Sequence, residues 1–313
     1  MPIPEYSVIC SVFLSLFSLS AFLSKAAPIY SAHYCTDSLT YKPNSTYQSN
    51  LRLLLSSLTS NANLGYSFYR NKTGSAAPDV VTGLFLCRGD ILTAGCHDCV
   101  TAAAKEISHL CPNQTEAIIW YDECMVRYSN GSLNNIVPGT DLMNNKSIAN
   151  SELDRFNQLL AGLLNSLATK AQNAQDTKFA TGEVNLTSTE TLYGLVQCTP
   201  ELSLFDCTMC FRSAIASVPN CCIGKLGVRI LLPGCNIRYE LYLFYNSTVS
   251  LPPASPTVGS ERSHRSVVLS FVIPIVVSLA LFVLGFISFG GKHVRSMIES
   301  WRKGDRATLL QTH

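Results

Sequence analysis

The sequence contains two Cys-x-x-Cys pairs, Cys96/Cys99 and Cys207/Cys210, which are its first candidates for a chemical function. Cysteines two residues apart are typical of thiol–disulfide oxidoreductases, in which a helix N-terminus lowers the pKa of one thiol. Paired cysteines also bind Zn²⁺ in tetrahedral sites. Redox catalysis, zinc binding and structural disulfides are therefore three alternatives.

Both pairs belong to a longer cysteine pattern that occurs twice in the chain. Five cysteines in each copy are separated by eight, two, eleven and twelve residues, and the second copy has Cys221 in addition. A repeat this regular predicts a duplicated disulfide module rather than isolated thiols. Redox catalysis and zinc binding are disfavoured for that reason, and no metal or other cofactor is expected. The second copy is displaced from the first by 111 residues: Cys87, Cys96, Cys99, Cys111 and Cys124 recur as Cys198, Cys207, Cys210, Cys222 and Cys235.

The N-terminus has the composition of a secretory signal peptide. An uncharged apolar stretch over 8–23 is followed by small residues, which predicts cleavage after about Ala26. The preceding residues include Glu5 and no Lys or Arg, so a signal anchor is the alternative. Removing 1–26 also removes Cys10 and leaves an even number of cysteines.

A second apolar segment, 267–289, is uncharged over 23 residues. A helix of this length spans a bilayer core of about 30 Å; a buried core helix is the alternative. Five Lys or Arg residues follow the segment and two closely precede it, which predicts a cytosolic C-terminus. Only 22 residues follow Gly291, without a Gly-rich loop or the catalytic motifs of a kinase, so no enzymatic activity is expected.

Glycosylation sequons agree with this type I topology. All seven precede the predicted span, which indicates an extracellular, glycosylated N-terminal part. They lie at Asn44, Asn71, Asn113, Asn130, Asn145, Asn185 and Asn246.

The charge distribution argues against nucleic-acid binding. Residues 27–265 contain 17 Lys or Arg and 18 Asp or Glu, with no basic stripe. The tail, 290–313, is basic, and four apolar residues in it have helical spacing, which predicts an amphipathic segment on the inner leaflet; a disordered tail is the alternative. These residues are Val294, Met297, Ile298 and Trp301.

Hydrophobic periodicity predicts the same elements in both copies. A leading amphipathic helix is predicted by leucines spaced three and four apart in 51–58 and 156–167, and a second helix begins at each Cys-x-x-Cys pair. Strand pairs then follow, 117–121 with 124–128 and 228–232 with 236–243. The predicted fold class is α+β: two tandem disulfide-stapled domains, each with helices packed on an antiparallel sheet, plus one C-terminal transmembrane helix. The predicted boundaries are 1–26 for the signal, 27–133 for the first domain, 134–150 for a linker, 151–246 for the second domain, 247–266 for a stalk, 267–289 for the span and 290–313 for the tail.

The cysteine signature and its flanking residues resemble the ginkbilobin-homologous, or stress-antifungal, domain of land plants. The resemblance rests on the Cys-x8-Cys-x2-Cys pattern, on Gly-Leu-Phe-Leu-Cys at 83–87 and on Cys-Asn-Ile-Arg-Tyr-Glu at 235–240. Two such domains, a stalk and one span resemble the ectodomain of cysteine-rich receptor-like kinases without the kinase, and also plasmodesmata-located proteins.

The resemblance implies most of the disulfide pairing. In the first copy it implies Cys35–Cys111, Cys87–Cys96 and Cys99–Cys124, and in the second Cys198–Cys207 and Cys210–Cys235. No cysteine of the second copy corresponds to Cys35, so Cys221 and Cys222 are unassigned. A vicinal disulfide, an interchain bridge and two free thiols are the alternatives.

Some members of the family bind mannose through an Asn just after the first cysteine, an Arg six residues before the last and a Glu five residues after it. The second copy has Arg229 and Glu240 at matching positions, but the Asn has no secure counterpart, and Asn145 is only nearby. As an alternative, Arg229 and Glu240 form a cross-strand ion pair of the predicted hairpin, worth at most about 1 kcal/mol. The first copy is expected to lack the site because it has Thr36, Ile118 and Ser129 at these positions.

These observations predict a non-enzymatic cell-surface glycoprotein of plants, located in the plasma membrane, whose ectodomain recognises an extracellular ligand or partner in stress or defence signalling. The expected partners are a receptor-like kinase or another copy of the chain in the membrane, and a cell-wall or microbial glycan. A plasmodesmal organiser of cell-to-cell transport and a mannose-type antifungal protein are the alternatives.

Overall fold

The computed structural model describes residues 27–36, 39–131, 133, 138–174 and 177–247, all of which belong to one compact unit. The predicted signal peptide, transmembrane helix and cytosolic tail lie outside these residues. Within the described ranges, no helix is both long and apolar enough to cross a membrane.

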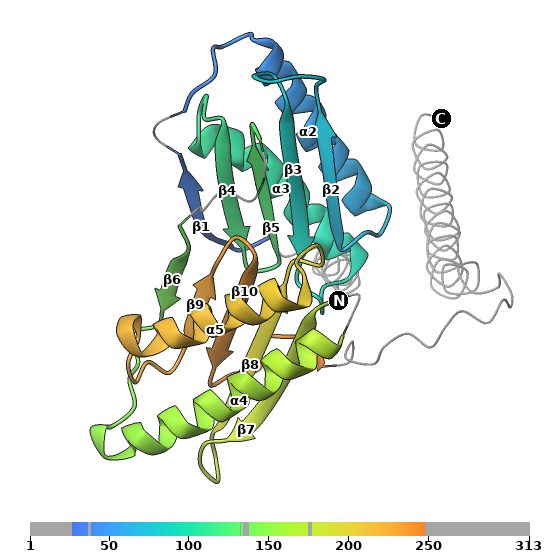
Figure 1. Cartoon of the computed structure of the whole chain (residues 1–313). Coiled ribbons are helices and arrows are strands. Elements are labelled where there is room, and N and C mark those ends of the chain that lie inside the picture. Colours follow the sequence, from blue (N-terminus) through green and yellow to red (C-terminus); the bar gives the residue numbers. More distant parts are fainter. Residues whose placement is uncertain (1–26, 37–38, 132, 134–137, 175–176, 248–313) are drawn as a thin grey trace, which may run out of the picture. The chain divides into compact units, whose positions relative to one another are not determined.

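Two five-stranded antiparallel sheets form the framework, as Figure 1 shows. The first has the order β1-β4-β5-β3-β2 and the second the equivalent order β6-β9-β10-β8-β7, so the duplication seen in the cysteines extends to the topology. The first sheet consists of β1 (Tyr30–Cys35), β2 (Phe68–Thr73), β3 (Val81–Cys87), β4 (Glu116–Tyr121) and β5 (Cys124–Ser129). The second consists of β6 (Thr140–Met143), β7 (Phe179–Asn185), β8 (Thr191–Cys198), β9 (Val228–Leu231) and β10 (Cys235–Glu240).

Two helices cover one face of each sheet (Figure 1). One helix in each domain has a serine N-cap. Ser45 Oγ accepts a hydrogen bond from the Gln48 amide, and Ser203 Oγ accepts one from the Asp206 amide. The helices are α2 (Thr46–Asn63) and α3 (Thr93–Leu110) in the first domain, and α4 (Leu153–Asn173) and α5 (Leu204–Cys221) in the second, where a short 3₁₀ helix, η1 (Asn150–Glu152), precedes α4.

Each domain has its own hydrophobic core between its helices and its sheet, as the helical leucine patterns predict. A third cluster lies on the other face of the first sheet, where Leu86, Ile118 and Trp120 pack with Leu231 of the second domain. β3 is therefore buried along its whole length, since helices cover one face and this cluster the other. The predicted antiparallel α+β architecture with tandem disulfide-stapled domains is confirmed.

The last strand ends earlier than the sequence predicts. β10 stops at Glu240, three residues before the predicted end at Leu243. The chain leaves the sheet there because its aromatic residues make other contacts: the Phe244 ring lies 4.0 Å from the Arg238 guanidinium, and Tyr245 Oη donates to the Gly182 carbonyl.

Candidate functional site at the junction of the two domains

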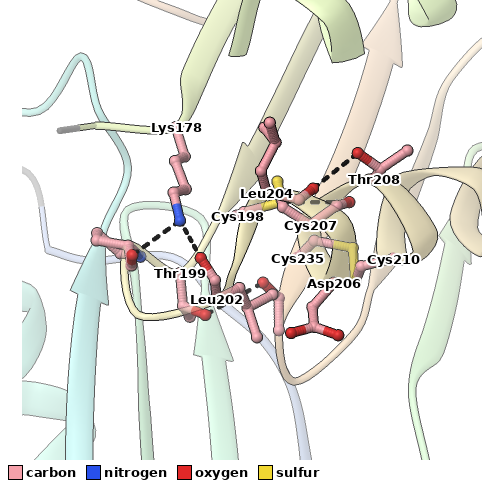
Figure 2. The surroundings of a disulfide bond; sticks show 12 residues. Lys178, Cys198, Thr199, Leu202, Leu204, Asp206, Cys207, Thr208, Cys210 and Cys235 are labelled. Carbon is pink, nitrogen blue, oxygen red and sulfur yellow. Dashed lines mark hydrogen bonds between the residues drawn. A yellow bond between two sulfur atoms is a disulfide. The ribbon is translucent and has the colours of Figure 1, made fainter. Parts of the chain in front are cut away.

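The Cys-x-x-Cys cysteines do not pair with each other in either domain. Cys87–Cys96 and Cys99–Cys124 join α3 to strands β3 and β5, and Cys35–Cys111 joins β1 to the end of α3. Cys198–Cys207 and Cys210–Cys235 repeat the first two links around the N-terminal turns of α5, the surroundings of which are drawn in Figure 2. These are the five pairs that the family resemblance implies. Both motifs therefore serve as disulfide anchors for a helix in this structure.

The second domain has a sixth disulfide, between the adjacent residues Cys221 and Cys222. Of the three alternatives that the sequence leaves open, the structure has the vicinal bridge. The carboxylate of Asp141 and the two sulfurs lie within 4.8 Å of one another.

The strand register identifies the residue of the second domain that corresponds to the mannose-binding asparagine of some family members. Cys35 faces Ala117 across β1 and β4, and Met143 faces Val228 at the equivalent place across β6 and β9. The next residue, Asn144, therefore corresponds to Thr36. The backbone agrees, because the Thr36 amide donates to the Glu116 carbonyl and the Asn144 amide to that of Gly227. Asn144, rather than the neighbouring Asn145, occupies the position of the sugar-binding asparagine.

Asn144, Arg229 and Glu240 line one open pocket of about 290 Å³. Its other side is formed by the first domain, through the N-terminal residues Ile29, Tyr30 and Ser31. The pocket combines an amide, a carboxylate and a partly exposed tyrosine, a set that suits a neutral ligand carrying several hydroxyl groups.

Gly227 leaves room for two polar side chains of this pocket. A Cβ atom there would lie 1.9 Å from Oε2 of Glu240 and 2.4 Å from Nδ2 of Asn144. The side chains of Glu240 and Asn144 thus converge over the glycine, in the space that a side chain at position 227 would need.

The predicted ion pair between Arg229 and Glu240 is wrong, because the hairpin register places Arg229 opposite Arg238. Arg229 instead reaches the first domain, where its Nη1 lies 2.9 Å from Oδ1 of Asp122 and 3.2 Å from Oγ of Ser31. Oε1 of Glu240 accepts from Nε of Arg238 at 3.2 Å. Arg229, one of the two residues singled out for sugar binding, therefore also holds the two domains together.

Asp122, in the β4–β5 turn, is the centre of this junction. Its Oδ1 lies 2.6 Å from Nη1 of Arg238 and 3.4 Å from Nη1 of Arg88, in addition to its contact with Arg229. Burial, followed by the neighbouring Arg238, lowers the pKa of Arg229. Burial also raises the pKa of Glu240, although Arg238 opposes that shift. Buried charges of this kind are tolerated because they are paired and hydrogen-bonded.

The segment after β10 is tied to the first domain as well. The Phe244 carbonyl accepts from Nη2 of Arg88, and the Asn246 amide donates to Oδ2 of Asp90 at 2.7 Å. Arg88 and Asp90 form an ion pair of 2.6 Å. The junction thus extends from the β4–β5 turn to the last described residues of the second domain.

The predicted glycosylation sites differ in exposure. Asn44, Asn145, Asn185 and Asn246 are exposed, whereas Asn71, Asn113 and Asn130 are half-buried. The amide of Asn71 is engaged in the fold, because its Nδ2 donates to Oγ of Ser57 in α2 at 2.8 Å.

Comparison with known proteins defines the class. The model of the salt stress response/antifungal family matches residues 34–131 and 143–242, and the chain belongs to this family. The chain is similar to cysteine-rich receptor-like protein kinase 25 of Arabidopsis thaliana, with 44% identity over 79% of this chain and 38% of that protein. It is also similar to the putative cysteine-rich receptor-like protein kinase 9 of the same plant, with 41% identity over 79% of this chain and 94% of that protein. It thus spans about two fifths of the length of the first of these relatives.

Solved structures show the same tandem fold. The tandem DUF26 ectodomain of the Arabidopsis thaliana cysteine-rich receptor-like protein PDLP8 has a TM-score of 0.58 and 23% identity, covering 68% of this chain and 98% of that one. The corresponding ectodomain of PDLP5 has a TM-score of 0.57 and 23% identity, covering 68% of this chain and all of that one. The fold and the relatives together support an extracellular, receptor-like role.

Sequence reasoning missed Asn144, Asp122 and Arg238. A signal for Asn144 exists, because it follows directly after a strand, as Thr36 does, but with a displacement of 108 rather than 111 residues. For Asp122 there is no local signal, since its partners Arg229 and Arg238 are more than 100 residues away in the sequence.

Proposed function

We propose that this protein is a receptor-like membrane glycoprotein whose two domains together recognise an extracellular ligand or partner and which catalyses no reaction itself. The observation that carries the proposal is the junction: a charged network and an apolar cluster join two domains of a family that occurs in receptor-like ectodomains. A two-domain unit of fixed geometry suits recognition, because it presents a preorganised surface and loses little entropy on binding.

In the proposed topology, residues 1–26 are a cleaved signal, 267–289 span the plasma membrane once and 290–313 face the cytosol. The ectodomain then carries the glycans. Peptide N-glycosidase treatment of the full-length protein should lower its apparent mass by several glycans, and protease added outside intact cells should leave the C-terminal epitope protected. An unchanged mass together with loss of the C-terminal epitope would contradict this topology.

A partner carries the signal in this proposal, either a receptor-like kinase or a second copy of the chain. Crosslinking in the membrane followed by immunoprecipitation should recover one of them with the wild-type protein. The Asp122→Asn variant, which disturbs the junction, should recover less at equal surface expression. A uniform plasma-membrane signal from a fluorescent fusion agrees with the receptor-like role, whereas puncta at cell–cell connections would favour the alternative of a plasmodesmal organiser.

Carbohydrate binding is a second candidate function, favoured by the convergence of Asn144, Arg229 and Glu240 on one pocket. A glycan array with the full-length protein should give mannose-type signals that Asn144→Ala abolishes. The control is Thr36→Ala at the matched position of the first domain. Asn144 is preferable to Arg229 as the test residue because Arg229 also holds Asp122. Equal array signals from both variants and the wild type would remove this pocket as a sugar site.

A further inference from the structure

The strand β6 is an edge strand of the second sheet and the counterpart of β1 in the first (Figure 1). It pairs with β9 over four residues, whereas β1 has six residues and pairs with β4 at five positions. Both strands end in the same way, because the Thr36 amide donates to the Glu116 carbonyl at 3.3 Å and the Asn144 amide to the Gly227 carbonyl at 2.9 Å. The two edge strands therefore allow a matched comparison within one chain.

The two strands differ in how they are linked to the helices. The disulfide Cys35–Cys111 ties the end of β1 to the end of α3. In the second domain, Met143 stands at the position of Cys35, and Cys222, the counterpart of Cys111, is bonded to its neighbour Cys221. All residues of β6 belong to the described part of the chain, and none of them has a covalent link to α5.

The side chains of β6 also make few contacts with the core of their own domain. Successive residues of a strand face opposite sides of the sheet. On the side where Cys35 packs against the core of the first domain, β6 has Asp141 and Met143, which are both exposed. Leu142, on the other side, packs against the apolar cluster at the domain junction. Hydrogen bonds to β9 and this single leucine therefore hold β6 in place.

We propose that β6 is a movable wall of the open pocket, and that it separates from β9 while the rest of the second domain stays folded. Short segments with few buried apolar contacts belong to the parts of a protein that open at low free energy. The pocket is lined by Leu142, Met143 and Asn144, so separation of β6 removes one wall and carries Asn144 away from Gly227.

This motion couples β6 to whatever occupies the pocket. A ligand that contacts Asn144 binds only when β6 is paired, so binding and pairing favour each other by the same factor. The inference concerns the motion of the chain itself and does not depend on whether the pocket binds a sugar.

The comparison with β1 sets the size of the effect. One backbone hydrogen bond changes an opening equilibrium by about fivefold. The strand β1 has one more paired position than β6 and a covalent tie in addition. Amides of β6 should therefore exchange with solvent at least about tenfold faster than those of β1.

The first test is hydrogen exchange of the full-length protein, resolved by mass spectrometry over 30–36 and 140–144 and corrected for intrinsic rates. The Asn144 amide should exchange at least about tenfold faster than the Thr36 amide, although its hydrogen bond is the shorter of the two, while amides of α4 and β10 remain protected. Equal protection of Asn144 and Thr36 would overturn the proposal.

The second test restores the missing tie. In Met143→Cys/Cys221→Ser, the new thiol faces Cys222 as Cys35 faces Cys111, and peptide mapping of the oxidised protein shows whether they are bonded. The bonded variant should exchange over 140–144 at least about tenfold more slowly than the control Met143→Ser/Cys221→Ser. An unchanged rate in the bonded variant would overturn the proposal.

A third variant needs no new bond. Leu142→Ala should speed exchange over 140–144 by about tenfold, because Leu142 is the apolar anchor of β6, and should leave 30–36 unchanged. No change over 140–144, or an equal change in both segments, would likewise overturn the proposal.

Discussion

Replacing Asp122 with Asn removes the charge on which the domain junction depends. In the wild type, one carboxylate oxygen lies 2.6 Å from Arg238 and 2.9 Å from Arg229. Asn keeps the size and one acceptor but no longer neutralises the two guanidinium groups. Their side chains are only 6% and 19% exposed, so solvent compensates poorly for the lost charge.

The expected cost follows from these contacts. Hydrogen bonds to charged groups contribute about 1.5–3 kcal/mol each, and Asn retains part of each bond. We therefore expect a loss of about 3 kcal/mol, which raises the population of molecules with an opened junction by about two orders of magnitude. The double variant Asp122→Asn/Arg229→Gln should lose less than the sum of the single variants, since it also removes one unpaired cation.

Hydrogen exchange measured by mass spectrometry reports this opening. The Asn246 amide, which donates to Asp90 across the junction, should exchange up to about 100-fold faster in peptides covering 241–247, while amides of α2 remain protected. Glu190→Gln, on the exposed β7–β8 turn, is the charge-matched control and should leave both regions unchanged. If peptides 241–247 exchange at the wild-type rate in Asp122→Asn, the central role of Asp122 is refuted.

Three further predictions concern stability. Replacing both Cys35 and Cys111 with Ser should lower the free energy of unfolding by about 4–5 kcal/mol, because this disulfide closes a long loop. The same change at the adjacent residues Cys221 and Cys222 should lower it by less than about 1.5 kcal/mol in chemical denaturation. Equal losses would contradict the expected dependence on the number of residues in the loop. Gly227→Ala should destabilise the protein by about 1–3 kcal/mol because the new Cβ collides with the carboxylate of Glu240. Gly162→Ala, whose Cβ meets nothing within 4 Å, is the control and should be neutral or stabilising. Similar melting temperatures for the two variants would contradict tight packing of Glu240 against Gly227. Because burial raises the pKa of Glu240 above its ordinary 4.5, the folded state binds the proton more tightly, so this group adds stability as the pH falls through its folded pKa and removes it as the pH rises. The melting temperature of the wild type relative to Glu240→Gln should therefore increase on acidification toward pH 4.5, and a decrease would show that the pairing with Arg238 outweighs burial.

Much of the architecture follows from local sequence patterns, for identifiable reasons. The helices α2 and α4 each bury one leucine-rich stripe. The 3.6-residue period of these leucines in the sequence therefore predicts both helices. β3 and the inner part of β8 were not predicted, because strands buried on both faces lack the alternation that marks a half-exposed strand. β1 and β6 were also missed, since they are short edge strands whose pairing depends on residues far along the chain.

Only those residues of the candidate site that lie at a fixed distance from a cysteine could be predicted from the sequence. Arg229 and Glu240 stand at fixed distances from Cys235, so a comparison of cysteine spacing finds them. Asn144 stands before α4, which is 21 residues long compared with 18 for α2, and this difference shifts the repeat. Without Cys35's counterpart as a landmark, only the β6–β9 register identifies it.

The two domains also satisfy the same buried arginine in different ways. In the first, Arg127 pairs with Glu116 of β4, directly across from Ser129. In the second, the equivalent Arg238 pairs with Glu240 of its own strand, and Gly227 stands at the position that corresponds to Glu116. The carboxylate thus stands on opposite strands of the hairpin in the two domains, which keeps the arginine paired in both and places the Glu240 carboxylate over Gly227.

This exchange decides where a ligand can bind. In the first domain, Ile118 and Ser129 are both fully buried at the positions of Arg229 and Glu240, and Ile118 belongs to the apolar cluster of the junction. That face is used to hold the second domain and offers no polar pocket at these positions. In the second domain, the transferred carboxylate and the glycine create a pocket whose far wall is the first domain. A ligand at this pocket would contact both domains, so its affinity should depend on the junction as well as on the residues that touch it.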